Sequence, residues 1–110
     1  QSPVKIILMN NNYLGNVRQW QDMFFHQRKS FTRMLNPHYQ LVADAYHIPY
    51  QVVTDRADLK AAVEKMLATD GPFILECAVK EEDNVAPMIA PGASIDEMML
   101  EINIKTELDC

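Results

Sequence analysis

The chain carries a short apolar run at residues 4–9 in which apolar and polar side chains hardly alternate, Lys5 being the only polar member. A strand with one face in water alternates, whereas a strand covered on both faces of a parallel sheet does not. The run therefore predicts a buried, central strand of a parallel sheet. It stops at Asn10-Asn11-Asn12. Because asparagine tolerates left-handed backbone, these residues predict a sharp turn at the carboxyl end of the strand.

Two helices are expected after this turn. The first is predicted at about 15–28, because apolar residues recur at helical spacing in Tyr13, Val17, Trp20 and Phe24. The second is expected to begin with Asn36 as N-cap and Pro37 in its first turn, and to be ended by Pro49.

A third helix is expected between two further strands, at 50–53 and 73–79. Thr54 or Asp55 would cap this helix, and Gly71-Pro72 is a typical stop signal. Its spacing predicts an inward face made of Leu59, Val63, Met66 and Leu67.

The resulting order is strand, helix, helix, strand, helix, strand, which indicates an α/β fold with a partial, doubly wound parallel sheet. Residues 1–80 would form this portion of the domain. Residues 81–110 turn acidic and then carry prolines, which is typical of a C-terminal arm and tail, with a short helix expected at 95–100. Three strands make a thin sheet, so we expect a covering segment upstream of Gln1.

Composition argues against several kinds of partner. A length of 110 residues predicts one domain or part of one. A net charge of −5 argues against a nucleic-acid partner, and no apolar run approaches the roughly 20 residues of a membrane span. Two cysteines without metal spacing and the lack of a signal peptide predict a cytoplasmic chain with reduced thiols. The basic cluster of the first half forms either a solvated face or a surface for an anionic ligand: Arg18, Arg28, Lys29 and Arg33.

The three glycines of the chain are too far apart to form either a dinucleotide fingerprint or a P-loop. A phosphate-binding role must therefore use other atoms. Ligands of open α/β sheets bind beyond the carboxyl ends of the strands, where the asparagine turn is predicted. Side-chain amide oxygens and backbone carbonyls are hard donors suited to Mg²⁺ on a diphosphate. The alternatives are that the turn only links a strand to a helix, and that Trp20 is an ordinary core residue.

A series of short motifs keeps its order and spacing over about residues 1–100: 3–11, 13–15, 17–21, 36–37, 43–46, 70–72, 82–85, 87–88, 91–93 and 96–98. In these motifs the chain resembles the acetolactate synthase (acetohydroxyacid synthase) family, large catalytic subunit. The resemblance implies that residues 1–80 are the later part of a domain that binds thiamine diphosphate. The run from Val17 to Trp20 favours the synthases over other enzymes that use this cofactor.

The resemblance also implies roles for individual residues. The side chain of Asn11 and the backbone carbonyl of Tyr13 would be ligands of Mg²⁺. Tyr13 would thereby also belong to the cofactor-binding residues, and the thiazolium side of the cofactor would be lined by Leu14, Gly15, Asn16 and Val17. The family usually has Met where this chain has Asn16. Trp20 would project into the substrate channel. The Gly-Asp-Gly opening of the motif, with its Asp ligand, is expected upstream, and no catalytic residue is expected in these 110 residues.

The activity that the resemblance implies is the condensation of two 2-oxoacids, pyruvate with pyruvate or 2-oxobutyrate, with loss of CO₂, in branched-chain amino-acid biosynthesis. FAD bound through other domains, a homo-oligomer of the catalytic subunit and a small regulatory subunit are further implied partners. The isolated chain is expected to be inactive. Two alternatives stay open: a stand-alone α/β binding or regulatory module, and a fragment of another thiamine-diphosphate decarboxylase or oxidase.

Overall fold

A computed structural model describes residues 2–82 and 84–102 of the chain. These residues fall into two compact units. Within the described residues, the sheet unit comprises residues 2–12 and 35–80, and the arm unit comprises residues 13–34, 81–82 and 84–102. Among the described residues, no helix is long and apolar enough to cross a membrane.

The sheet unit contains three parallel strands: β1 (Lys5–Asn10), β2 (Tyr50–Val53) and β3 (Phe73–Ala78). The α/β class and the parallel sheet are confirmed. The strand order is β1-β3-β2, so β3 is central. The prediction of a central first strand is wrong for the described sheet, because β1 lies at its edge and Met9 is 63% exposed. A strand that is apolar on both faces is expected to be buried on both faces. The local sequence does not show which segments bury it, and so it does not give the position of the strand in the sheet.

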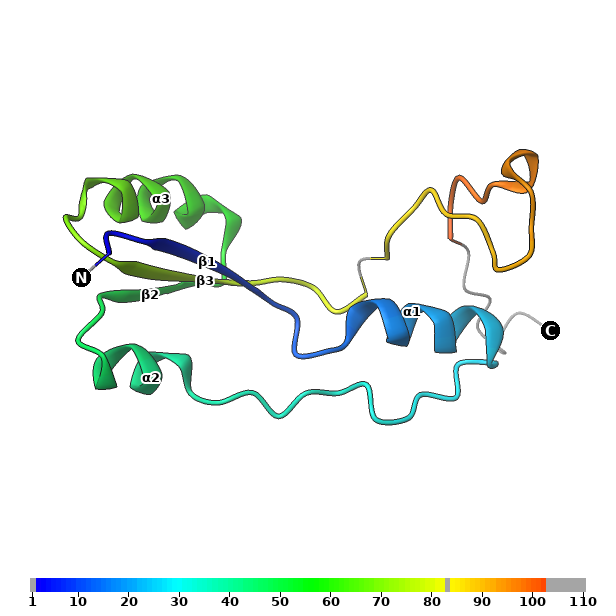
Figure 1. The fold of residues 1–110 in the computed structure, drawn as a ribbon, viewed down its shortest axis with the longest axis horizontal. Coiled ribbons are helices and arrows are strands. Elements are labelled where there is room, and N and C mark those ends of the chain that lie inside the picture. Colours follow the sequence, from blue (N-terminus) through cyan, green and yellow to red (C-terminus); the bar gives the residue numbers. More distant parts are fainter. Residues whose placement is uncertain (1, 83, 103–110) are drawn as a thin grey trace. The chain divides into compact units, whose positions relative to one another are not determined.

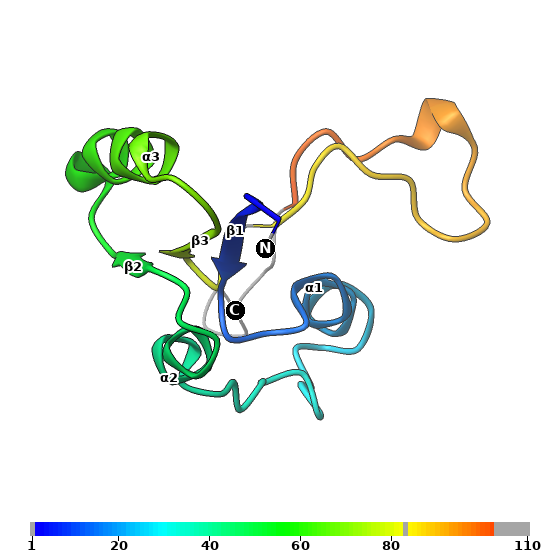
Figure 2. The ribbon, with the colours of Figure 1, turned by 60° about the vertical axis from the view of Figure 1, so that its left-hand side comes forward.

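Two helices lie on opposite sides of this sheet, α2 (Tyr39–Ala45) and α3 (Leu59–Ala68), as the views in Figures 1 and 2 agree. The helix α3 packs on the core face, because alternate residues of β3 point toward it. The core cluster consists of Val53, Ala62, Met66, Phe73, Leu75 and Cys77. Helices on both faces confirm the doubly wound arrangement over the described strands.

The helix boundaries depart from prediction at two caps. Asp55, one of the two predicted caps, accepts a hydrogen bond from the backbone N–H of Ala57 at 2.8 Å and caps a short 3₁₀ turn, Arg56–Asp58, ahead of α3. The predicted N-cap role of Asn36 is wrong, because α2 begins three residues later and His38 precedes it. Asn36 instead donates hydrogen bonds to two side chains of the asparagine turn.

The arm unit is built on α1 (Gly15–Phe24). The helix is shorter than the predicted 15–28, because His26 and Gln27, which follow its C-cap Phe25, both adopt left-handed backbone. Of the predicted helix at 95–100, only a 3₁₀ turn at Ile95–Glu97 forms, with Ser94 completing a capping box.

Polar residues form the buried face of α1: Arg18, Gln19 and Asp22. The expectation that Arg18 belongs to a solvated face is therefore wrong. Its guanidinium donates to the backbone carbonyl of Glu81 and lies 3.8 Å from the carboxylate of Asp22. The apolar series that predicted the helix lies on its outer side, because Val17, Trp20 and Phe24 are exposed.

Candidate functional site

The turn after β1 is held by its own side chains. Asn10 ends the strand, and its Oδ1 accepts a hydrogen bond from the backbone N–H of Asn12 at 3.0 Å. Asn12 adopts left-handed backbone, with φ of 57°. Asn36 Nδ2 lies 2.9 Å from Asn10 Oδ1 and 3.2 Å from Asn12 Oδ1. The predicted sharp turn is thus present, and Asn11 stands at its centre.

A buried carboxylate anchors this turn from the central strand. Glu76 is only 8% exposed, and its Oε1 accepts a hydrogen bond from Asn10 Nδ2 at 2.7 Å. Its Oε2 accepts one from the hydroxyl of Tyr50 on β2. Sequence reasoning missed Glu76. The signal available was a lone acidic residue inside the apolar run of a central strand, where buried charge is costly unless it is hydrogen-bonded.

These side chains line a polar hollow of about 300 Å³ on the α2 face of the sheet. Its wall includes Asn10, Asn36, Tyr39, Tyr50 and Glu76. Partial burial, followed by the hydrogen bond to Glu76 and the negative charge of that residue, raises the pKa of Tyr50 to about 12. Tyr50 therefore stays protonated at neutral pH and acts as a donor to the carboxylate.

The chain enters α1 directly after the turn. Tyr13 forms an isolated antiparallel bridge with Arg33, and Leu14 N–H donates to the carbonyl of Thr32 at 2.8 Å. The helix then begins at Gly15 with no side-chain cap and no acidic residue in its first turn. The N–H groups of such a first turn favour an anion, because they have no partner within the helix.

Trp20 lies one turn further along α1 and is 41% exposed. Its ring meets that of Phe24 edge-on, with centroids 6.3 Å apart and an interplanar angle of 88°. The alternative that Trp20 is an ordinary core residue is therefore not supported in the described chain. An exposed, oriented indole is available for contact with a ligand or another segment.

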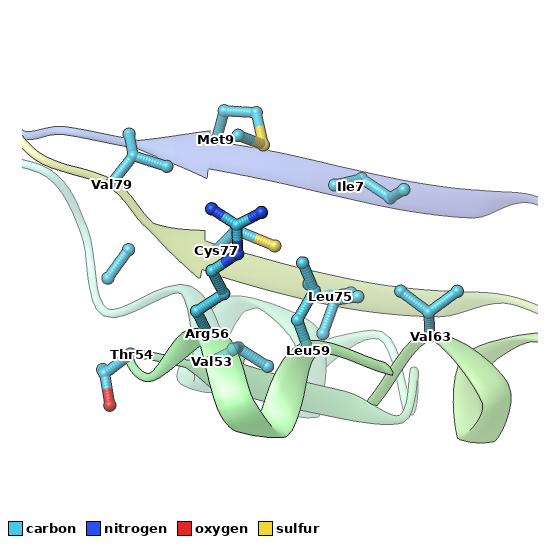
Figure 3. A pocket seen from close by; sticks show the side chains of 11 residues that line it. Ile7, Met9, Val53, Thr54, Arg56, Leu59, Val63, Leu75, Cys77 and Val79 are labelled. Atoms are coloured by element: carbon cyan, nitrogen blue, oxygen red, sulfur yellow. The ribbon is translucent and has the colours of Figure 1, made fainter. Parts of the chain in front are cut away.

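A second hollow, of about 400 Å³, lies on the other face of the sheet, between the strands and α3 (Figure 3). Its lining is almost entirely apolar and is drawn from β1, β3 and α3, including Ile7, Met9, Leu59, Val63, Leu75 and Cys77. Figure 3 shows Arg56 as the one charged side chain in this lining. Thr54 supplies the one side-chain oxygen of this lining, which is fewer than the several oxygen ligands that Mg²⁺ takes.

Residues 1–77 match a protein family described as thiamine pyrophosphate enzyme, C-terminal TPP binding domain. Three curated relatives show how far the similarity extends. The chain is 41% identical over 104 residues to acetolactate synthase isozyme 2 large subunit of Escherichia coli K12, which covers 94% of the chain and 19% of that protein. It is 40% identical over 101 residues to acetolactate synthase large subunit of Pyropia yezoensis, covering 90% of the chain and 17% of the relative.

The third relative is acetolactate synthase 1, chloroplastic, of Oryza sativa subsp. japonica, with 35% identity over 107 residues and again 90% and 17% coverage. The chain therefore spans less than a fifth of the length of these relatives. The similarity also extends past the end of the family match at residue 77 and into the segment after residue 80.

Proposed function

The chain belongs to the thiamine pyrophosphate enzymes, as a C-terminal domain that binds thiamine diphosphate, and on this premise we propose that it is the later part of an acetolactate synthase catalytic subunit. The observation that carries the proposal is the extent of the similarity. The family match covers residues 1–77, whereas the acetolactate synthases match 90–94% of the chain and so include part of the C-terminal arm after residue 80. A different decarboxylase or oxidase of the family, or a stand-alone binding module, gives no reason for the arm to match as well.

The chain's donors fit a magnesium diphosphate. Asn11 follows the last residue of a strand in a turn fixed by the hydrogen bonds of Asn10 and Asn12. Neutral amide and carbonyl oxygens are ligands that Mg²⁺ accepts. We propose that Asn11 Oδ1 and the carbonyl oxygen of Tyr13 bind the metal, and that an Asp outside these 110 residues completes the set.

The first turn of α1 is proposed to bind and orient the cofactor. Its uncapped N–H groups suit the diphosphate, and residues 14–17 would line the thiazolium side. When bound, thiamine diphosphate supplies the chemistry that removes CO₂ from pyruvate and joins the remaining carbons to a second 2-oxoacid, pyruvate or 2-oxobutyrate. Trp20 is proposed to shape the channel for this second substrate, a role that fits its exposed indole.

Assembly and location are proposals of the same kind. A homo-oligomer of the catalytic subunit, a small regulatory subunit and FAD would all engage parts of the protein beyond this chain. We propose a cytoplasmic enzyme of branched-chain amino-acid biosynthesis, while the name of the rice relative places that protein in the chloroplast.

The test uses the full-length protein that contains this chain. We expect it to form acetolactate from pyruvate, and we expect EDTA to abolish the activity and Mg²⁺ to restore it. Asn11→Ala should raise the Mg²⁺ concentration for half-maximal activity by about 10-fold or more, because it removes a proposed ligand, and loss of even an outer-shell partner typically costs about 10- to 100-fold in metal affinity. Asn84→Ala, at an exposed arm residue, is the matched control and should leave it unchanged. Absence of acetolactate, or the same metal requirement in both variants, would contradict the proposal.

A further inference from the structure

Glu76 is the one buried carboxylate of the described sheet, and the proposed function gives it no role. It lies on β3 opposite Leu8 of β1 and Val52 of β2, so it faces the α2 side of the sheet. Each of its oxygens accepts a hydrogen bond, Oε1 from Asn10 and Oε2 from Tyr50.

The carboxylate dictates how the carboxamide of Asn10 is oriented. An ionised carboxylate only accepts hydrogen bonds, so the NH₂ end of Asn10 must face Glu76. The oxygen of Asn10 must then point the other way, toward the turn. There it accepts the backbone N–H of Asn12 at 3.0 Å and Asn36 Nδ2 at 2.9 Å.

The orientation continues through the rest of the turn. Asn36 also donates to Asn12 Oδ1 at 3.2 Å, so one amide group ties both flanking asparagines together. Asn12 is held in left-handed backbone, with φ of 57°. The direction of the backbone on either side of Asn11 therefore depends on a chain of hydrogen bonds that starts at Glu76.

Fold stability alone gives little reason for a carboxylate at this position. Desolvation of a buried charge offsets much of what its partners contribute, and apolar side chains of similar volume often serve a core equally well. The opposite face of β3 shows this alternative, because Phe73, Leu75 and Cys77 pack there in the apolar core. The buried carboxylate is better explained by the orientation that it imposes on Asn10.

We propose that Glu76 is a positioning residue for the metal-binding turn: through Asn10 it presets the backbone around Asn11 for Mg²⁺ and the diphosphate. The inference rests on the proposed function, in which Asn11 is a ligand. Outer-shell partners of this kind hold ligands in place and contribute to metal affinity without touching the ion.

The experiment uses the full-length protein and measures binding as well as activity. Isothermal titration gives the affinity for thiamine diphosphate at a series of Mg²⁺ concentrations in wild type, Glu76→Leu and Glu76→Gln. Leucine keeps the volume and removes the acceptors. Glutamine keeps an acceptor for Asn10, while its NH₂ can face the oxygen of Tyr50. Ile74→Ala, two residues away on the same face of β3, is the control for a change that only loosens packing.

We expect Glu76→Leu to raise the Mg²⁺ requirement for cofactor binding by about 10-fold, and Glu76→Gln to recover most of the loss. Ile74→Ala should lower the melting temperature and leave the requirement unchanged. Asn36→Ala tests the same turn from a partly exposed position, so it remains informative if Glu76→Leu does not fold. It should weaken Mg²⁺-dependent binding in the same direction.

Two results would overturn the inference. One is an unchanged Mg²⁺ requirement in Asn36→Ala and in every folded Glu76 variant. The other is an equal loss in Ile74→Ala, which would reduce the effect to general destabilisation. Failure of the proposed function is a separate outcome, because wild type itself would then show no Mg²⁺-dependent binding of thiamine diphosphate.

Discussion

Asn10 uses both ends of its carboxamide inside the sheet unit, one toward Glu76 and one toward the turn. Three consecutive asparagines look alike in sequence, and only the partners separate them. Asn12 adopts left-handed backbone, and the carboxamide of Asn10 is oriented by its hydrogen bonds. Asn11, between them, is the proposed ligand.

The ionisation of Tyr50 gives the first prediction at this scale. Partial burial, the hydrogen bond to Glu76 and the charge of Glu76 raise its pKa to about 12 from 10.0. In Glu76→Gln the last two causes weaken, so the pKa should move back toward 10. Ultraviolet titration of tyrosinate, with Tyr50→Phe to assign the signal, measures it. An unchanged late-titrating tyrosine in Glu76→Gln would contradict the contact.

The same shift fixes the sign of a pH effect. The pKa of Tyr50 is higher in the folded protein than the reference value of 10.0. Its contribution to the free energy of unfolding is therefore fully present below pH 10 and is lost as the pH rises through about 12. Tyr50→Phe should flatten the decline of stability in this window, as denaturant titrations at successive pH values would reveal.

Trp20 carries a prediction about substrate choice. In the full-length protein, Trp20→Ala should change the ratio of products formed from 2-oxobutyrate and pyruvate by about 10-fold, a size typical of altered pocket contacts. Phe25→Ala, at another exposed aromatic position of the same unit, is the control. An unaltered ratio in a competition assay would remove Trp20 from the proposed channel.

At the scale of elements, α3 contains two neighbouring residues, Met66 and Leu67, that the sequence pattern places on the same inward face but that differ in burial. Met66 is 3% exposed and packs in the core, whereas Leu67 is 66% exposed. Met66→Ala should lower the free energy of unfolding by about 2–5 kcal/mol. Leu67→Ala should change it by about 0.5 kcal/mol or less, as at other exposed positions. Urea titrations compare the two directly, and equal losses would contradict the packing of α3.

Sequence predicts elements better than faces. Sequence predicts the three strands to within a residue of their ends, because their apolar runs and stop signals are local. The helix after β2 is predicted as an element, but it begins only at Leu59, after a 3₁₀ turn that the predicted cap at Thr54 or Asp55 does not anticipate. Sequence does not predict the exposed position of Leu67 or the polar buried face of α1. The side chain of Gln19 forms hydrogen bonds with the backbone of Val85, 66 residues away. The local hydrophobic periodicity of a helix does not indicate such a distant partner.

Part of the candidate site is unpredictable for the same reason, because its residues are far apart in the sequence. The turn was predictable from its asparagines, whereas Glu76 meets Asn10 across 66 residues of sequence. A lone acidic residue in the apolar run of β3 indicates a buried charge that needs hydrogen-bond partners, but the sequence does not identify those partners. Only the parallel register of β1 on β3 brings the two side chains together.

Gln19 gives a prediction about the arm. Its Oε1 accepts the N–H of Val85 at 2.7 Å, and its Nε2 donates to the carbonyl of the same residue at 3.0 Å. Gln19→Ala should therefore speed hydrogen exchange at Val85 and proteolysis of the segment around it. Gln21→Ala, which removes hydrogen bonds to Ser30 instead, is the matched control. Equal protection of the arm in wild type and Gln19→Ala would contradict this contact.

At the scale of the whole chain, the sheet unit leaves apolar surface uncovered. Along β1 both faces are exposed, with Ile6, Ile7 and Met9 among the open side chains. One face continues into the apolar hollow beside α3. Parallel sheets occur almost only with both faces covered, and uncovered apolar edges favour association. In the full-length protein proposed here, further chain would supply that cover.

The 110-residue chain alone should therefore self-associate and be catalytically inert. Association follows from the exposed edge and face of β1, and inertness from the proposed need for ligands and groups elsewhere in the protein. Light scattering and dye fluorescence measure the first, and an acetolactate assay with added cofactor and Mg²⁺ the second. Met9→Lys should reduce association by placing charge on the open face of β1, whereas Lys80→Arg, which preserves charge at an exposed position, should not. A clean monomer with low dye binding would contradict the first expectation, and detectable acetolactate from the pure chain would contradict the second.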